Sequence, residues 1–254
     1  MRHPPLSRAA VGSRVIRLTR IASTNNRAKE LARSGAPHGT AVVAAEQTEG
    51  RGQRARRWAS PPGGLWASVL LRPRGVRAAQ AGLLNIAAAT AGAEAASALS
   101  GVAVTVKWPN DLLVSERKIG GVLVETAIAG ENIAWAVIGI GINANIAVEA
   151  LPLRLRRSAT TLLHETGREI ALDRVLLEIC GRLEGLLGML ERGQTDRVLA
   201  RWRALDTTPG REVRASNGAW TGTASGINAA GQLLITAGDG HLITVSTSAG
   251  VSIE

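Results

Sequence analysis

The chain has 254 residues and a formal net charge of +10, and 45 % of its residues are apolar. This length supports a sizeable core, and no apolar run approaches the roughly 18 residues of a membrane-spanning helix. The start of the chain shows no apolar segment typical of a secretory signal, and the single Cys180 cannot form an internal disulfide. We therefore expect a cytoplasmic protein with no membrane partner.

The positive charge invites comparison with nucleic-acid-binding proteins, but its distribution argues against that class. The arginines are spread along the chain, and there is no Phe or Tyr to stack on bases. A basic surface can equally steer an acidic protein partner. We expect no DNA partner, because residues 1–17 form a polar lead-in that is too short for a helix-turn-helix domain.

The first elements after the lead-in alternate between polar turns and short apolar runs. Ser23, Thr24 and Asn25 precede a helical stretch at 27–32, where they are typical of a helix cap or, equally, of the rim of a polar pocket. Apolar or alternating runs predict strands at 40–45, 65–71, 102–106, 121–126 and 133–138. The alanine-rich stretch 78–99 favours a helix.

Residues 49–58 are the first segment with a chemical character. They place four arginines around two glycines, directly after a predicted strand. Glycines let the backbone approach a phosphate closely, and arginines supply forked hydrogen-bond donors, so this arginine loop suits an anion. Taken alone, so short a run is better explained as a solvated basic surface loop, and the anion site depends on the motifs that follow.

Two of the three lysines in the chain, Lys107 and Lys118, lie in one short stretch. The sequence at 109–111 predicts a turn that keeps Lys107 and Asp111 close to one edge of a sheet. A lysine can neutralise charge on a phosphate or a carboxylate, and a nearby carboxylate can orient it or help to hold Mg²⁺. Asp111 equally fits a simple turn former.

Glycines mark two backbone surfaces downstream. Gly120 and Gly121 allow main-chain amides to lie close to a ligand. Residues 137–145 predict a strand with Gly139 and Gly141 at alternate positions, so a flat group could lie against the bare backbone there. The pattern lacks the third glycine and the following helix of a dinucleotide-binding fingerprint.

The last part of the chain predicts a long helix and then a separate β unit. Apolar residues recur at spacings of three and four from 173 to 190, which predicts a helix that packs on a sheet and holds Cys180 as a core residue. The helical pattern ends near 205. Strand-like runs at 212–215, 220–224, 232–236 and 242–247 predict a small antiparallel barrel or sheet.

Together these motifs resemble those of the bacterial biotin protein ligases, in order and in spacing. The residues that carry the resemblance are Ser23-Thr24-Asn25, Gln47, 50–58, Gly63-Gly64-Leu65, 107–111, 117–125 and 139–143. The arginine loop combined with Lys-Trp-Pro-Asn-Asp is specific to that family, and the resemblance extends over about 18–254. It implies an α+β fold, in which residues 18–205 form a mixed sheet with flanking helices, like class II aminoacyl-tRNA synthetases, and residues 206–254 form a small SH3-like β barrel.

The resemblance also implies roles for individual residues. It assigns catalysis to Lys107, Arg51, Arg54 and Arg56. It assigns biotin binding to Ser23, Thr24, Asn25, Gln47, Gly50, Arg51, Gly63, Gly64, Leu65, Lys107, Lys118, Gly120 and Gly121. It assigns nucleotide binding to Arg54, Arg56, Trp58, Asn110, Gly139, Gly141 and Asn143, and it leaves Asp111 as a candidate ligand of Mg²⁺.

The implied activity is ATP-dependent. Biotin is activated as biotinyl-5'-AMP and then transferred to a lysine of a biotin carboxyl carrier protein domain, by a monofunctional ligase without the N-terminal DNA-binding domain of its bifunctional relatives. A homodimer is compatible with this class. Two alternatives stay open: a lipoate or octanoate ligase-type acyltransferase, and a non-catalytic basic module that binds nucleotide or nucleic acid.

Two positions depart from the loop pattern of the family, which commonly reads Gly-Arg-Gly-Arg-Arg-Gly-Arg. Gln53 replaces the fourth residue and Ala55 the sixth. Gln53 removes one charge, and Ala55 restricts a backbone that glycine leaves free. We expect looser retention of biotinyl-AMP and some labelling of untargeted lysines.

Overall fold

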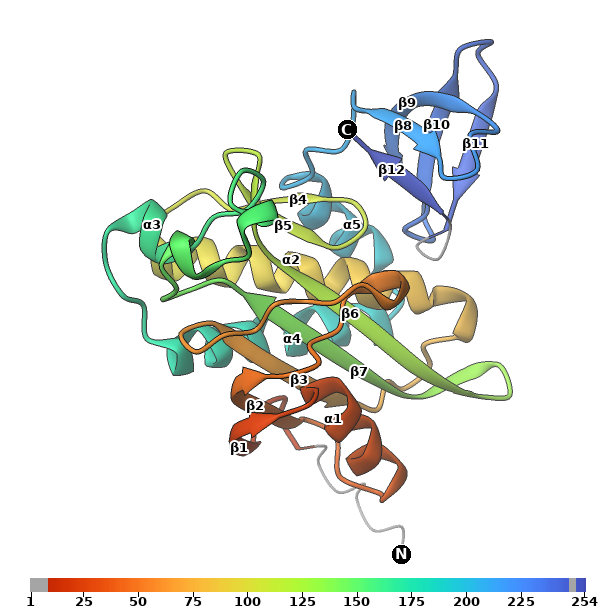
Figure 1. Cartoon of the computed structure of the whole chain (residues 1–254). Helices are drawn as coiled ribbons and strands as arrows, with labels where there is room; N and C mark the ends of the chain where they lie inside the picture. Colours follow the sequence, from red (N-terminus) through yellow and green to blue (C-terminus); the bar gives the residue numbers. More distant parts are fainter. Residues whose placement is uncertain (1–8, 247–249) are drawn as a thin grey trace, which may run out of the picture.

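The computed structural model describes residues 9–246 and 250–254 of the chain. A large sheet with helices on both faces forms most of the molecule, and the end of the chain forms a smaller sheet beside it (Figure 1). The expected α+β class, with a mixed sheet followed by a small β domain, is confirmed.

The large sheet has seven strands in the order β1-β2-β3-β7-β6-β5-β4. These strands are β1 (Arg14–Ile21), β2 (Thr40–Gln47), β3 (Leu65–Leu71), β4 (Thr105–Lys107), β5 (Asp111–Val114), β6 (Arg117–Ala129) and β7 (Asn132–Ile142). β1 and β2 run parallel, whereas every other neighbouring pair in this sheet is antiparallel.

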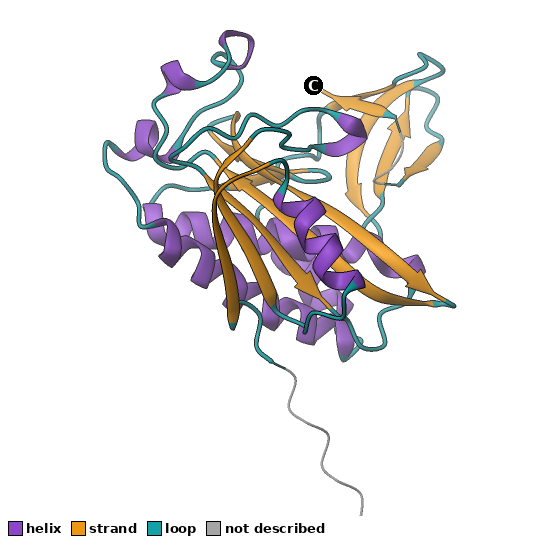
Figure 2. Ribbon diagram, turned by 60° about the horizontal axis from the view of Figure 1, so that its bottom comes forward, coloured by secondary structure: helices purple, strands orange, loops and turns teal. Residues whose placement is uncertain are grey.

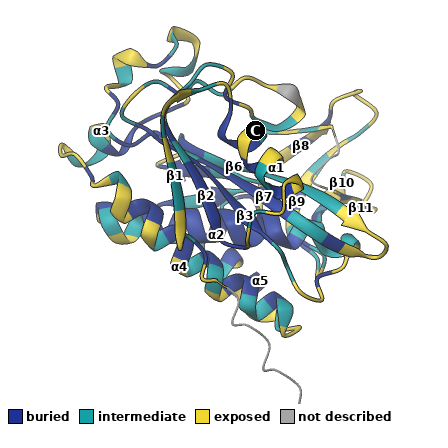
Figure 3. Cartoon of the chain, turned by 90° about the horizontal axis from the view of Figure 1, so that it is seen from below, coloured by how far each residue is buried: buried dark blue, intermediate teal, exposed yellow. Residues whose placement is uncertain are grey.

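Helices cover both faces of this sheet (Figure 2). α2 (Ala81–Ser100) and α4 (Leu172–Glu191) lie on one face, and α1 (Thr24–Arg33) packs on β2, β3 and β7 from the other. Every residue of β3 is buried as a result, and the central strands form the buried centre of the molecule (Figure 3). This explains why β3 reads as a nearly continuous apolar run without polar alternation.

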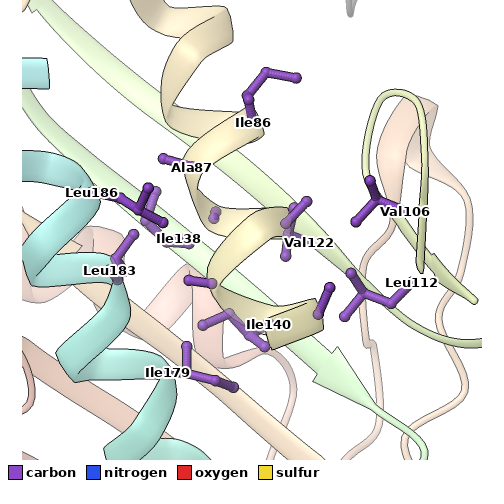
Figure 4. Packing of buried hydrophobic residues seen from close by; sticks show 14 of the residues in the cluster. Ile86, Ala87, Val106, Leu112, Val122, Ile138, Ile140, Ile179, Leu183 and Leu186 are labelled. Carbon is purple, nitrogen blue, oxygen red and sulfur yellow. The ribbon is translucent and has the colours of Figure 1, made fainter. Parts of the chain in front are cut away.

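The main core lies between the sheet, α2 and α4. Ala87 of α2 lies on the side of Ile138 of β7, and Leu183 and Leu186 of α4 pack against the same layer (Figure 4). Alanines are buried along most of α2, and their small side chains let it approach both the sheet and α4 closely. α2 ends at Gly101, whose φ of 78° is the left-handed conformation that favours glycine at a helix C-terminus.

Two shorter helices follow the large sheet, and the small domain follows them. α3 (Leu162–Thr166) lies near one end of the large sheet. α5 (Thr195–Arg203) packs on α2 and α4. The small domain contains β8 (Glu212–Ala215), β9 (Thr221–Ile227), β10 (Leu233–Ala237), β11 (Leu242–Val245) and β12 (Val251–Ile253). Their order is β11-β10-β9-β8-β12, and all neighbouring pairs are antiparallel.

Most predicted elements occur at or near their expected positions, and three differences have physical causes. The strand predicted at 102–106 is observed as β4, three residues later, because the side chains of Ser97 and Ser100 accept the backbone N–H groups of Val104 and Val102. β1 begins inside the segment predicted as a lead-in. Its pattern is weak because it is an edge strand that has no buried residue.

The third difference is that the sequence pattern predicts neither β5 nor β12. β5 has only four residues, and β12 has only three and pairs with β8 at the edge of the small sheet. At the other end of the chain, Ser23 occupies the N-cap position of α1, but its side chain makes no capping hydrogen bond. Residue 247 of the strand predicted at 242–247 lies outside the described residues.

Candidate active site

A cavity of about 540 Å³ opens where one end of the large sheet meets the arginine loop and the small domain. Gln47 at the end of β2, Lys107 at the end of β4 and Gly141 near the end of β7 all reach it. Residues far apart in the sequence therefore meet at one end of the large sheet.

Gln47 joins the start of α1 to the segment after the arginine loop. Its Oε1 accepts hydrogen bonds from the backbone N and the Oγ1 of Thr24, at 2.8 and 3.0 Å. Its Nε2 donates to Oγ of Ser60 at 2.9 Å. These bonds hold both the oxygen and the nitrogen of the Gln47 amide in place. The end of the cavity lined by Gln47 and Thr24, the polar end, is therefore preorganised by contacts within the chain.

Asn25 also lines the cavity, and its side chain is held by residues of β3 and β6. It is 5 % exposed. Its Oδ1 accepts from the buried Ser68 hydroxyl on β3 at 2.6 Å, and its Nδ2 donates to Glu125 on β6 at 2.9 Å. Gly139 leaves the room for this side chain, because a Cβ there would lie 2.2 Å from Oδ1 of Asn25.

A flat group does lie against the bare backbone of β7 at Gly141, and it is a side chain of this chain, the indole ring of Trp58. A Cβ at Gly141 would lie 2.9 Å from the indole nitrogen of Trp58, so the glycine lets the ring approach β7. The ammonium of Lys118 lies 5.1 Å from the centroid of the Trp58 ring, a distance at which a cation is attracted to an aromatic face. Trp58 thus forms one wall of the cavity.

The arginine loop folds back on itself beside the cavity. The backbone N–H of Trp58 donates to Gly50 at 2.8 Å, and that of Gly52 donates to Arg56 at 2.7 Å. These bonds narrow the loop. Its residues Arg51, Gln53, Arg54, Arg56 and Arg57 line the cavity. Arg54 has a φ of 54°, an uncommon conformation for a residue other than glycine.

The two lysines of the second motif lie on β4 and β6, the strands on either side of β5. Lys107 on β4 pairs in register with Asp111 on β5, as the turn at 109–111 predicts. The Asp111 carboxylate makes an ion pair with Lys118 on β6. Asp111 therefore orients Lys118, and Lys107 is left with its ammonium 3.5 Å from the carbonyl oxygen of Ile253.

The described residues do not form a metal site on their own. No group of three His, Cys, Asp or Glu side chains suited to a metal ion occurs within residues 9–246 and 250–254. The two carboxylates that line the cavity are both paired, Asp111 with Lys118 and Glu116 with Arg211. The expectation that Asp111 holds Mg²⁺ therefore gains no support from this arrangement.

The small domain also reaches the cavity, which the sequence motifs do not indicate. Val251, Ser252 and Ile253 of β12 line it, and Nη1 of Arg54 donates to the carbonyl oxygen of Val251 at 3.1 Å. This contact joins residues 197 positions apart, so no local pattern reveals it. The sequence gives no role to Ser68 or Glu125 for the same reason, because their partners Asn25 and Arg51 lie 43 and 74 positions away.

Most of the predicted site residues meet at this cavity. Those that line it are Ser23, Thr24, Asn25, Gln47, Arg51, Arg54, Arg56, Trp58, Lys107, Asn110, Asp111, Lys118, Gly121, Gly139, Gly141 and Asn143. Those that do not are Gly50, Gly63, Gly64, Leu65 and Gly120.

The glycines outside the lining are explained by close packing of the chain. A Cβ at Gly50 would lie 2.4 Å from the carbonyl oxygen of Trp58, and one at Gly120 would lie 2.6 Å from that of Gly141. Gly64 stands against the Trp66 ring in the same way. These glycines shape the walls behind the cavity instead of its surface.

The charge of the cavity indicates its ligand. Six cationic side chains line it, against two carboxylates, so it favours an anionic ligand. A cationic loop, a lysine at a sheet end and a preorganised polar end are the features expected of a catalytic domain for an anionic small molecule and a phosphate. No helix within the described residues is long and apolar enough to cross a membrane.

Comparison with known proteins agrees with this class. Residues 17–143 match the biotin/lipoate A/B protein ligase family. The bifunctional ligase/repressor BirA of Bacillus spizizenii is 34 % identical over 245 residues, covering 92 % of this chain and 73 % of that protein. The biotin–[acetyl-CoA-carboxylase] ligase of Mycobacterium tuberculosis is 30 % identical over 76 % of this chain and 70 % of its own length.

A solved structure supports the same conclusion over almost the whole chain. The biotin protein ligase of Aquifex aeolicus, in complex with biotin and ATP, is 29 % identical and superposes with a TM-score of 0.79, covering 95 % of this chain and 98 % of that one. The chain belongs to the biotin/lipoate A/B protein ligase family, which confirms the resemblance that its motifs carry.

Proposed function

We propose that this chain is an ATP-dependent biotin–protein ligase, which forms biotinyl-5'-AMP and transfers the biotinyl group to a lysine of a carrier protein. The observation that carries the proposal is the cavity where the arginine loop, Lys107 and the Gln47–Thr24 pair converge. The similarity to a ligase solved with biotin and ATP supports the choice of substrates.

In the first half-reaction, a carboxylate oxygen of biotin attacks the α-phosphorus of ATP. A bond forms between that oxygen and phosphorus, and the bond from phosphorus to the bridging β-phosphate oxygen breaks, so pyrophosphate leaves. Lys107 and the arginine side chains supply positive charge where negative charge develops, and the preorganised polar end holds the biotin ring.

In the second half-reaction, the ε-amine of the acceptor lysine attacks the acyl carbon of biotinyl-AMP. An amide bond forms, the bond from the acyl carbon to the phosphate oxygen breaks, AMP leaves, and the amine loses a proton to solvent. A phosphate paired with arginines is the better leaving group, because the cations stabilise the charge it acquires. The acceptor we propose is a biotin carboxyl carrier protein domain.

The proposal is tested by incubating the chain with ATP, biotin and a biotin-acceptor domain. Pyrophosphate release that depends on biotin, together with a mass increase of the acceptor, is the expected result. Parallel reactions with lipoate or octanoate in place of biotin test the nearest enzymatic alternative. Nucleotide binding without biotin-dependent pyrophosphate release would overturn the proposal in favour of a non-catalytic binding module.

A further inference from the structure

A carboxylate just outside the cavity ties the arginine loop to the scaffold. Glu125 lies on β6, and it is not among the residues that line the cavity. Its Oε1 contacts Nζ of Lys29 at 2.7 Å and Nη1 of Arg51 at 3.0 Å. Its Oε2 accepts from Nδ2 of Asn25 at 2.9 Å. One side chain thus joins β6, α1 and the base of the arginine loop.

This junction is partly shielded from water. The side chain of Lys29 is 17 % exposed and that of Glu125 is 23 % exposed, against 39 % for Arg51. One carboxylate stands between two cations, so it offsets their mutual repulsion and leaves the cluster with net positive charge. Burial raises the pKa of Glu125, but hydrogen bonds from Lys29 and Asn25 and the charges of Lys29 and Arg51 outweigh it and lower that pKa overall.

Arg51 uses a single nitrogen for these contacts. Its Nη1 donates to both oxygens of Glu125 and to Oδ1 of Asn26, at 3.0 to 3.2 Å. An arginine has five N–H donors in a rigid planar fork, so fixing one nitrogen fixes the direction of the others. Arg51 lines the cavity, and its contacts with Glu125 and Asn26 leave the Nε and Nη2 donors for a ligand.

We propose that Glu125 is a positioning residue for the proposed ligase reaction: it holds Arg51 by Nη1 and so aims the remaining guanidinium donors at the phosphate of the acyl-adenylate. This inference rests on the proposed function. Glu125 does not touch the ligand and acts through Arg51, so its removal loosens retention of the intermediate without removing the binding cations.

The test measures dissociation of preformed biotinyl-AMP from the Glu125→Gln variant. The amide keeps an acceptor for Asn25 but loses the charge that fixes Arg51, and we expect the intermediate to leave about tenfold faster, the scale of one charge-assisted hydrogen bond. The matched control is Glu46→Gln on β2, which removes the same charge from an ion pair with Arg20 on β1. If Glu125→Gln does not fold, Glu125→Asp replaces it, with the same direction expected.

Two further variants separate positioning from simple stabilisation of the fold. Lys29→Met removes the other cation of the cluster but leaves the Glu125–Arg51 contact, so it should lower the melting temperature while retaining the intermediate as the wild type does. Arg51→Gln alone should speed dissociation, and adding Glu125→Gln to it should produce no further increase, because Glu125 acts through Arg51.

The outcomes are distinguishable from failure of the proposed function. A wild-type chain that makes no biotinyl-AMP overturns the ligase proposal, and this inference with it. A wild type that makes and holds biotinyl-AMP, with Glu125→Gln holding it equally well, overturns only the role of Glu125. Additive effects of Glu125→Gln and Arg51→Gln would also overturn it, because they would show that Glu125 acts independently of Arg51.

Discussion

The indole nitrogen of Trp108 donates a 3.0 Å hydrogen bond to the carbonyl oxygen of Gly231, across the boundary between the large and small domains. Trp108 directly follows Lys107, and Gly231 lies in the turn between β9 and β10. Oδ1 of Asn228 accepts the backbone N–H groups of Ala230 and Gln232, which stiffens that turn. The small domain thereby helps to set the position of the lysine motif.

Replacing Trp108 with Phe should destabilise the chain and slow adenylation. The ring is 2 % exposed, and the shorter side chain leaves both a cavity and an unpaired Gly231 carbonyl. We expect a loss of about 2 kcal/mol in the free energy of unfolding, measured by urea denaturation. Trp220→Phe, at a half-buried tryptophan of the small domain, is the control. Equal losses in the two variants would show that the contact with Gly231 has no special weight.

Replacing Lys107 with Ala should lower the rate of adenylate formation by at least about 10²-fold, the scale for losing one donor at a developing charge. The ammonium lines the cavity, and its nearest fixed contact is the carbonyl oxygen of Ile253 at 3.5 Å. Pre-steady-state measurement of adenylation checks this. A rate equal to that of the wild type would remove Lys107 from the proposed mechanism.

Replacing Gln53 with Arg should slow the release of biotinyl-AMP and reduce labelling of untargeted lysines. Gln53 lines the cavity, so an arginine there adds a cation close to the intermediate. Release is measured by rapid filtration, and stray labelling by mass spectrometry of a bystander protein. Gln194→Arg, which adds the same charge at the N-cap of α5, should change neither quantity. Unchanged release from Gln53→Arg would contradict the expectation.

Cys180 should be unreactive in the folded chain. It is 2 % exposed, and burial, with the nearby charge of Glu184, raises the pKa of its thiol to about 11. Only about one thiol in a thousand is then ionised at pH 8, and the thiolate is the reactive form. A thiol reagent should therefore label Cys180 slowly in native buffer and rapidly in denaturant. Rapid labelling under native conditions would show that this residue is not part of the core.

The contribution of Glu125 to stability should depend on pH. Its pKa is lowered from 4.5 in the folded chain, so its carboxylate stabilises the fold above pH 4.5 and this contribution fades as the pH falls through the folded-state pKa. The difference in unfolding free energy between the wild type and Glu125→Gln should shrink on acidification from pH 7. A difference that grows on acidification would contradict the lowered pKa of Glu125 in the folded chain.

Contiguous motifs made much of the site predictable from the sequence. The arginine loop and the Lys107–Asp111 segment carry their chemistry within a few residues, and both reach the cavity. β3 begins and ends where its apolar run predicts, because both faces of that strand are covered. Local patterns suffice where the determining contacts are local or where burial is uniform.

The remaining features depend on contacts between distant parts of the sequence, which only the folded chain creates. Glu125 meets Arg51 across 74 positions, and β12 meets Arg54 across 197. Neither residue pair has a local signature. Gly141 illustrates the same limit, because its bare backbone predicts a flat neighbour, while only the fold identifies that neighbour as Trp58.

The most direct test of the central claim omits the acceptor protein. The chain is mixed rapidly with ATP and biotin, and pyrophosphate is followed through the first turnover. A cavity that forms and holds biotinyl-AMP predicts a fast burst that is stoichiometric with the enzyme, requires biotin and is followed by slow release. Absence of a burst, or a burst of equal size without biotin, would contradict the account.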